Sequence, residues 1–437
     1  MPSTSGRLVA AALVLVAAVS GCSLTSSDSS PEEAALDLPT DLEPEPGTAI
    51  PQHTVAVGFT PYGDGLVGVA AENRGYFEEV GITFSQDNGI QADFSESFTP
   101  LLNGQVEIAS GYMPFFTQQI DTVTNLRTFM LSNVYLGTRV LAPAGRYQTV
   151  DELMEQGQTF EEAAATVMEQ LRGRRVVMPD GVDPTFFNLA LEQAGMTQGD
   201  VDVVRMSNPD IVRTAQAGDT DFAAPDGAVQ ISQLQQAGWE AVITIEQVID
   251  ALPDQTLDVR NVHTGYLTTT EYAEENYNTL LRFASVMYRI SAELEADPVA
   301  VAADFTDYLN SYTGSSLSVQ EVAGMFSNGL YSFRTFDTAT DFLGPDSDSP
   351  YYFAETSQAQ IATLRENDVL LRDHDVDDLS IAATVYEDLR DYREEAERLI
   401  AEAPEGELRT QAQTYFDHYN FLDAYRFALA ATEEGTG

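Results

Sequence analysis

Aromatic rings and carboxylates stand in four short loops, each directly after a segment that we expect to be a buried strand. The loops are 60–64, 110–114, 179–185 and 225–227. Aromatic faces stack on flat molecules and attract cations, and carboxylates accept hydrogen bonds from N–H groups. None of the four loops contains Arg, Lys or His, so their side chains favour a flat or cationic nitrogen compound as the ligand. The expected ligand contacts are Thr60, Pro61, Tyr62, Asp64, Ser110, Gly111, Tyr112, Asp180, Asp183, Thr185 and Asp226.

The same loops support a second interpretation. Several precede expected helices, whose N-terminal N–H groups bind an anion such as nitrate or a sulfonate without a basic side chain. Single residues also have structural explanations. Asp183 fits the N-cap of the next helix, and at least one of the adjacent Phe186 and Phe187 fits the core. In a chain with 69 acidic residues, chance explains Asp180 and Asp226 as readily as ligand binding does.

The elements that position these loops alternate between strand and helix patterns. Strands are expected at 55–59, 82–84, 106–109, 175–178, 201–204 and 222–224. The stretch Leu102–Tyr112 is typical of a helix end, a Gly turn, a short buried strand and a ligand-facing loop. The alternation predicts two α/β units with right-handed crossovers and mostly parallel sheets. Val134–Ala142 is expected to be a strand that crosses into the second unit, and Ala241–Ile245 to lead back.

The N-terminus resembles a bacterial export signal. Arg7 supplies a positive charge, Leu8–Val19 is a 12-residue apolar run, and Val19-Ser20-Gly21 precedes Cys22. An apolar run this short favours a signal peptide over a membrane-spanning helix. Small residues before the only Cys of the chain resemble a lipobox, so Cys22 is expected to carry a lipid that tethers the protein to the membrane. Ordinary export without a lipid and a buried Cys are the alternatives.

The charge of the chain is strongly negative. All 21 basic residues are Arg, 69 residues are acidic, and the formal net charge is -48. Such a surface repels phosphate backbones, so no nucleic-acid partner is expected. Self-repulsion of this size is screened at about 1 M salt, where the Debye length falls to about 3 Å. A saline habitat is therefore expected; a genome rich in GC would explain the missing Lys but not the excess of acids.

The length of 437 residues is enough for two domains with their own cores. The expected organisation is a signal peptide at 1–21, an acidic Ser- and Pro-rich linker at 22–51, a discontinuous first lobe at 52–139 and 246–380, a second lobe at 140–245, and a helical hairpin at 381–437, broken at 404–406. The aromatic second arm of this hairpin either packs on the body or forms a surface for a partner.

Several segments, in this order, carry a resemblance to a known family: Gly75-Tyr76-Phe77, Val80-Gly81-Ile82, Leu102–Ala109, Leu171–Val176 and Ala217–Ala224. They are similar to segments of the ABC-transporter substrate-binding lipoproteins of the nitrate/sulfonate/taurine and thiamine-pyrimidine-precursor group. The similarity covers roughly residues 52 to 375. This chain departs from the family pattern in having Phe222 where Ala is usual, a helical insertion near 154–170 and a longer C-terminal segment.

The resemblance implies an α/β, two-lobed periplasmic-binding-protein type II fold, with hinge strands that cross between the lobes and a cleft that closes on a small molecule. It also implies permease and ATPase subunits of an importer as partners, a position outside the cytoplasmic membrane and a monomeric receptor. The ligand is expected to resemble a thiamine-pyrimidine precursor. A small anion (sulfonate, taurine or nitrate), or a role as the ligand-sensing partner of a membrane receptor, is the alternative.

An enzymatic function is not expected from these residues. The resembled family includes a pyridoxal-phosphate-using pyrimidine synthase, but a Schiff base to that cofactor needs a lysine, which this chain lacks. The four His residues are scattered, without metal-ligand or catalytic-triad spacing. Asp373-His374-Asp375 could attract a cation, although a solvated acidic surface explains it equally simply. No catalytic residue, cofactor or metal is therefore expected.

Overall fold

The structure is a computed structural model that describes residues 36, 38, 46–91, 98–179, 185–345 and 347–436. The elements named below all belong to one compact unit, Leu38–Gly437. The expected signal peptide, Cys22, Asp180 and Asp183 lie outside the described residues.

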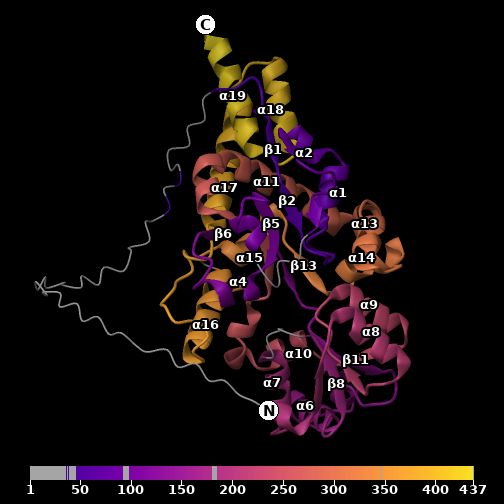
Figure 1. The fold of residues 1–437 in the computed structure, drawn as a ribbon. Helices are drawn as coiled ribbons and strands as arrows, with labels where there is room; N and C mark the ends of the chain where they lie inside the picture. The colour runs from indigo at the N-terminus through magenta and orange to yellow at the C-terminus, as the bar shows by residue number, and fades with distance from the viewer. Residues whose placement is uncertain are drawn as a thin grey trace, which may run out of the picture. The chain divides into compact units, whose positions relative to one another are not determined.

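The first lobe is built on a six-stranded mixed sheet with the strand order β13-β6-β12-β5-β2-β4 (Figure 1). Its strands are β2 (Val57–Phe59), β4 (Ile90–Gln91), β5 (Ile108–Tyr112), β6 (Leu126–Tyr135), β12 (His263–Thr269) and β13 (Tyr331–Phe333). β2 runs parallel to β4 and β5, whereas β12 and β13 run antiparallel to their neighbours. The strands between residues 53 and 112 pair in parallel, as expected, but the sheet as a whole is mixed, because β12 and β13 run in the opposite direction to their neighbours.

The expected strand 55–59 is divided into two short strands. β1 (His53–Val55) pairs in parallel with β3 (Ile82–Phe84), and β2 continues after Ala56 in the six-stranded sheet. The Ala56 N–H donates to a carboxylate oxygen of Glu107 at 2.5 Å, and the Ala56 carbonyl accepts from the Glu107 N–H at 2.8 Å. The Glu107 side chain thus takes the place of a neighbouring strand at the break.

The second lobe is a five-stranded sheet with the order β11-β7-β10-β8-β9. Its strands are β7 (Arg139–Pro143), β8 (Arg175–Met178), β9 (Asp202–Arg205), β10 (Phe222–Ala223) and β11 (Trp239–Thr244), and its helices are α5 (Val150–Glu155), α6 (Phe160–Glu169), α7 (Thr185–Glu192), α8 (Asn208–Ala217) and α9 (Ala228–Gln236). The strand expected at 175–178 has the same bounds in the structure. Reciprocal capping boxes start α5 at Thr149 and α6 at Thr159, and the helical insertion expected near 154–170 contains the end of α5 and all of α6.

Most of the remaining helices pack around the first sheet, whereas α10 (Ile245–Ala251) and the 3₁₀ turn η1 (Gln198–Asp200) contact strands of the second. The other helices are α1 (Val67–Asn73), α2 (Tyr76–Glu79), α3 (Thr99–Leu102), α4 (Met113–Gln119), α11 (Thr270–Ala296), α12 (Pro298–Ala303), α13 (Thr306–Thr313), α14 (Val319–Ser327), α15 (Thr340–Leu343) and α16 (Phe353–Glu366); the other 3₁₀ turns are η2 (Pro253–Gln255), η3 (Asp258–Arg260) and η4 (Phe336–Thr338). Phe283 of α11 lies at the centre of the core, with ring centroids 4.9 Å from Phe77, 5.7 Å from Phe129 and 5.0 Å from Tyr266.

The chain passes between the two sheets twice. The first crossing is the three-residue segment 136–138 between β6 and β7, so the single strand expected at Val134–Ala142 is two strands in two sheets. The segment expected to lead back, Ala241–Ile245, belongs mostly to β11, which pairs antiparallel with β7. The second crossing is longer and carries α10, η2 and η3 before β12 begins.

The C-terminal segment forms three helices rather than the expected hairpin of two arms. They are α17 (Ala382–Glu402), α18 (Glu407–Asp417) and α19 (Phe421–Thr436), drawn in yellow near the C-terminus in Figure 1. The second arm is interrupted at Tyr419, which has a positive φ of 66°. α19 packs on the body, because Asp423 forms a buried ion pair with Arg282 of α11 and Phe421 lies 4.9 Å from Phe336.

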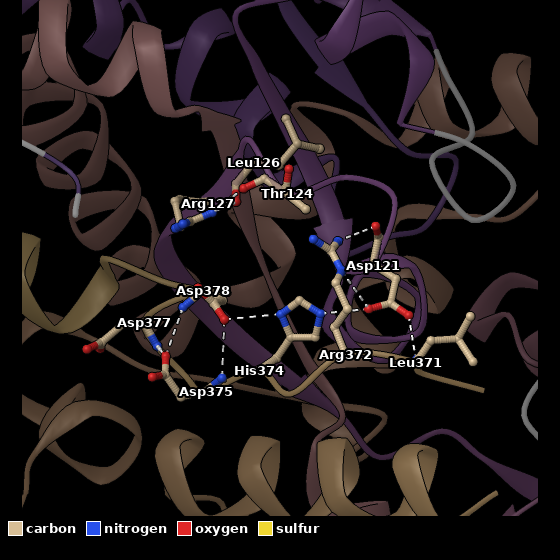
Figure 2. A network of polar contacts seen from close by, with 10 residues as sticks. All are labelled: Asp121, Thr124, Leu126, Arg127, Leu371, Arg372, His374, Asp375, Asp377 and Asp378. Atoms are coloured by element: carbon tan, nitrogen blue, oxygen red, sulfur yellow. Dashed lines mark hydrogen bonds and ion pairs between the residues drawn. The ribbon is translucent and has the colours of Figure 1, made fainter. Parts of the chain in front are cut away.

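A polar network ties the segment before α17 to the first lobe (Figure 2). The buried His374 ring lies between two carboxylates, with Nε2 2.8 Å from Asp121 and Nδ1 3.1 Å from Asp378. Arg372 also bonds to Asp121, and Thr128 of β6 exchanges backbone hydrogen bonds with residues 379 and 381. The acidic group around His374, considered above for cation binding, thus serves to attach this segment.

Candidate functional site

A cavity lies between the two lobes, at the crossing segments. Its volume, counted as the space open to the centre of a water-sized sphere, is about 130 Å³. Since about 10–15 Å³ of such space holds one water, the cavity accommodates a small organic molecule. Its walls come from the loop after β2 and from β5, α4, β12 and β13 in the first lobe, from α7 and the loop after β10 in the second, and from both crossings.

The structure brings most of the described expected contacts to this cavity. Those that line it are Thr60, Tyr62, Asp64, Gly111, Tyr112, Thr185 and Asp226. Pro61 and Ser110 do not line it, and Ser110 is fully buried. Residues 110–112 were expected in a loop after a strand ending at 109, but β5 continues to Tyr112, and Tyr112 is followed at once by α4. The Ser110 hydroxyl and the Tyr112 ring are therefore positioned by a strand and not by a loop.

The turn after β2 is fixed by a small cluster behind the cavity wall. The Thr60 N–H donates to the Ser110 hydroxyl at 3.0 Å, and the two hydroxyl oxygens are 3.1 Å apart. A Cβ atom at Gly65 would lie 2.6 Å from the Thr60 hydroxyl oxygen and 3.0 Å from that of Ser110. Ser110 thus positions Thr60, and only a glycine fits at residue 65 beside them.

Asp64 places a buried carboxyl group on the cavity wall. The Asn133 side chain donates to it at 3.2 Å, and Thr264 also bonds to it. Burial raises the pKa of Asp64 above its ordinary value, although the hydrogen bonds from Thr264 and Asn133 act in the opposite direction. The protonated form of Asp64 is therefore more accessible than that of a surface aspartate.

Aromatic rings form much of the remaining wall. The Tyr112 ring centroid lies 5.6 Å from Phe115 and 6.3 Å from Tyr135, both with edge-to-face geometry, and Tyr135 lies 5.3 Å from Tyr331. Phe186 and Phe187, at the start of α7, are both buried and both line the cavity from the second lobe. Flat molecules pack well against such rings.

The cavity residues that the sequence interpretation missed include Tyr135, Thr138 and Arg139, which stand at the first crossing. Arg139 overturns the premise that the site holds no basic side chain. Its guanidinium donates to the carbonyls of Gly137 at 2.8 Å and Leu136 at 3.2 Å. A charged residue within the apolar run 134–142 was the signal that could have found it.

The second crossing adds polar groups to the opposite wall. The Asn261 amide donates to Gln360 of α16 at 2.7 Å, and both residues line the cavity with Asp258. Across the described ranges, no group of three or more His, Cys, Asp or Glu is placed to hold a metal ion. No helix within those ranges is both long and apolar enough to span a membrane.

Two α/β lobes joined by crossing segments around a cavity define the two-lobed periplasmic-binding-protein fold. Solved structures with this fold are similar to the chain. The periplasmic aliphatic sulphonate binding protein SsuA from Escherichia coli has a TM-score of 0.54 at 16% identity, covering 77% of this chain and 99% of that one. The periplasmic nitrate-binding protein NrtA from Synechocystis PCC 6803 has a TM-score of 0.52 at 11% identity, covering 78% and 89%.

A third similar structure is the ligand-binding component of an ABC-type import system from Staphylococcus aureus, with zinc bound; its TM-score is 0.52 at 11% identity, covering 77% of this chain and 98% of that one. The family model described as NMT1/THI5 like matches residues 147–300. This match includes most of the second lobe and confirms the resemblance found in the sequence. No curated protein matches the chain.

Proposed function

We propose that the protein is the solute receptor of an ABC importer, anchored outside the cytoplasmic membrane by a lipid on Cys22 and working as a monomer with permease and ATPase subunits. The observation that carries this proposal is a cavity at the crossings whose walls come from both lobes. A site of this kind binds a small molecule only when both lobes contribute. The names of the three similar structures given above, two binding proteins and one import component, support the same role.

Hinge closure is the proposed mechanism. Tyr62 of the first lobe faces Gly227, the N-cap of α9 in the second lobe, and a Cβ atom at Gly227 would lie 3.7 Å from the Tyr62 ring. A ligand that contacts both lobes stabilises the arrangement in which they meet, and it shifts the open–closed equilibrium by its difference in affinity for the two states. The membrane subunits would then recognise the closed form.

The proposed ligand is a small nitrogenous heteroaromatic compound similar to a thiamine-pyrimidine precursor. Support comes from the rings of Tyr62, Tyr112 and Phe186 and the carboxylates of Asp64 and Asp226 around one cavity. A small anion such as a sulfonate or nitrate is the second candidate, and the specific observation in its favour is Arg139 on the cavity wall. We propose binding without a chemical step, since both ligand classes are cargo.

A thermal-shift screen of the full chain in high salt tests the proposal. Aminopyrimidines, sulfonates, taurine and nitrate are compared, and at least one class should raise the melting temperature. The Tyr62→Ala variant should lower the affinity for that class at least about tenfold, because the ring stands at the meeting point of the lobes. If no class raises the melting temperature, the receptor function is wrong. Import of the ligand that binds, lost when neighbouring transporter genes are deleted, separates a receptor for uptake from a sensor.

A further inference from the structure

The Tyr135 hydroxyl is a buried polar group that has no partner within the described part of the chain. Tyr135 is 7% exposed, its ring lines the cavity, and its hydroxyl oxygen makes no hydrogen bond there. The ring is seated over the first crossing, since a Cβ atom at Gly137 would lie 2.3 Å from three of its atoms. A buried hydroxyl costs free energy unless it is bonded, so this one is placed to bond to something that enters the cavity.

Arg139 presents a buried positive charge at the same place. It is 8% exposed, and its recorded hydrogen bonds go to two neutral carbonyls. Among the described residues no carboxylate forms an ion pair with Arg139: burial lowers the pKa of its guanidinium, and the charge of Glu246 only partly offsets this from a greater distance. A buried cation without an anionic partner is strongly disfavoured, so the site is complete only when an anionic group accompanies the guanidinium.

The opposite charge lies on other parts of the wall. Asp226 accepts a hydrogen bond from Asn208, and Asp64 bonds to Asn133 and Thr264. The Arg139 charge at the first crossing therefore shares the cavity with the carboxyl groups of Asp226 and Asp64, and all three groups act on the Tyr135 hydroxyl. A ligand that satisfies both carries an acidic oxygen as well as N–H donors.

We propose that Tyr135 and Arg139 together hold an anionic oxygen of the ligand, so that the solute is a flat nitrogen heterocycle bearing a carboxylate. The Tyr135 O–H and an Arg139 N–H donate to the carboxylate, and the ring nitrogens face the acidic part of the wall. This inference rests on the proposed receptor function and narrows its ligand class. It also assigns the specificity for the acidic group to residues that flank the segment joining the lobes. These residues belong to none of the four loops.

Two matched probes test the inference on the full chain by calorimetric titration. They are 4-aminopyrimidine-5-carboxylate and 4-amino-5-(hydroxymethyl)pyrimidine, which differ in the charge of one substituent. The variants Tyr135→Phe and Arg139→Gln each remove one donor. Tyr266→Phe is the control for the first, because the Tyr266 hydroxyl is also buried without a partner but does not line the cavity. Arg127→Gln is the control for the second, because Arg127 is also 8% exposed and bonds to the carbonyls of residues 124 and 126 (Figure 2).

The wild-type chain should bind the carboxylate at least about tenfold more tightly than the alcohol, because hydrogen bonds to charged groups are the stronger ones. Each site variant should lose about tenfold or more in affinity for the carboxylate and change the affinity for the alcohol by less than about twofold. The controls should leave both affinities unchanged. Tyr135→Phe should melt no lower than wild type without ligand, since it removes a hydroxyl with no partner, so it remains informative if Arg139→Gln fails to fold.

Equal affinity for the two probes, or an equal loss for both probes in the site variants, would overturn the inference. Binding of neither probe would also overturn it. The receptor function fails differently: it is refuted only if no member of the wider panel of heterocycles, sulfonates, taurine and nitrate raises the melting temperature of the wild-type chain.

Discussion

Replacing Asp423 by alanine should detach the C-terminal helices from the body. Asp423 is fully buried on α19 and accepts two hydrogen bonds from Arg282 of α11, both at 2.8 Å. Asn420 and Arg426 add bonds at 2.9 Å and 2.7 Å. Without this carboxylate the Arg282 charge stays buried and unpaired, and breaking a buried pair in this way costs about 3–5 kcal/mol.

Hydrogen–deuterium exchange measures this loss where it occurs. A cost of about 3–5 kcal/mol corresponds to roughly two to three and a half orders of magnitude in the opening equilibrium of α19. Amides of α17, α18 and α19 should therefore exchange faster by that factor, while those of the second-lobe sheet should not. The control is Asp417→Ala, since Asp417 is exposed at the end of α18 and bonds only to Gln413 in the recorded contacts.

A double variant separates lost charge pairing from lost packing. Arg282→Met combined with Asp423→Leu removes both charges and should recover most of the protection, because apolar residues of similar volume replace a buried ion pair at little cost. Burial raises the pKa of Asp423, but the hydrogen bonds and the charge of Arg282 lower it by more than burial raises it, so the net shift is downward. Its contribution is thus present above about pH 4, the unfolded value, and is lost as the pH falls through the folded value. An Asp423→Ala variant that exchanges like Asp417→Ala, or a double variant less protected than the single one, would refute this reasoning.

Three further predictions address the site, acid stability and salt. Gly137→Ala should weaken ligand binding at least about tenfold in calorimetric titration, because the added methyl group displaces the Tyr135 ring. Unchanged affinity would contradict the proposed role of the Tyr135 ring in ligand binding. Burial lowers the pKa of His263 to about 3, so the free energy of unfolding should fall as the pH drops from about 6.5 toward 3. Measured by urea denaturation at several pH values, the free energy of unfolding of His263→Gln should depend less on pH over that range. With a net charge of -48, raising KCl from about 0.1 to 1 M should raise the melting temperature, and a flat response would contradict the inferred role of self-repulsion.

The alternation of elements was predictable from the sequence because local signals mark it. The strand 175–178 follows the turn 172–174 and has its expected bounds, and strands alternate with helices through both sheets. Antiparallel pairing was not predictable, because β12 joins β5 and β6 from more than a hundred residues away. The interruption at Tyr419 was also missed, since neither Gly nor Pro marks it and a non-glycine residue takes the positive φ.

The candidate site was predicted in part for a related reason. Tyr62 and Asp226 follow strands and Tyr112 ends one, and the ends of strands can be located from apolar patterns. Tyr135 and Arg139 flank the point where the chain changes sheets. The crossing was expected within Val134–Ala142, but as one continuous strand, so the sequence did not show that these two side chains would line the cavity. The absence of basic residues from the four loops therefore said nothing about the charge that the crossing segment brings.

The contact of Thr60 with Ser110 has a consequence for how fast a solute could be captured. These two residues and Gly65 fix one side of the cavity through contacts within the protein itself, without a ligand. Little ordering is then left to that side, and under the proposed hinge mechanism the slow event in capture is the rotation of the second lobe about the two crossings, the segment 136–138 and the segment between β11 and β12. The association rate would then be limited by a rigid-body rotation and not by loop folding. A change in the length of a crossing segment should therefore change the association rate constant more than the dissociation rate constant.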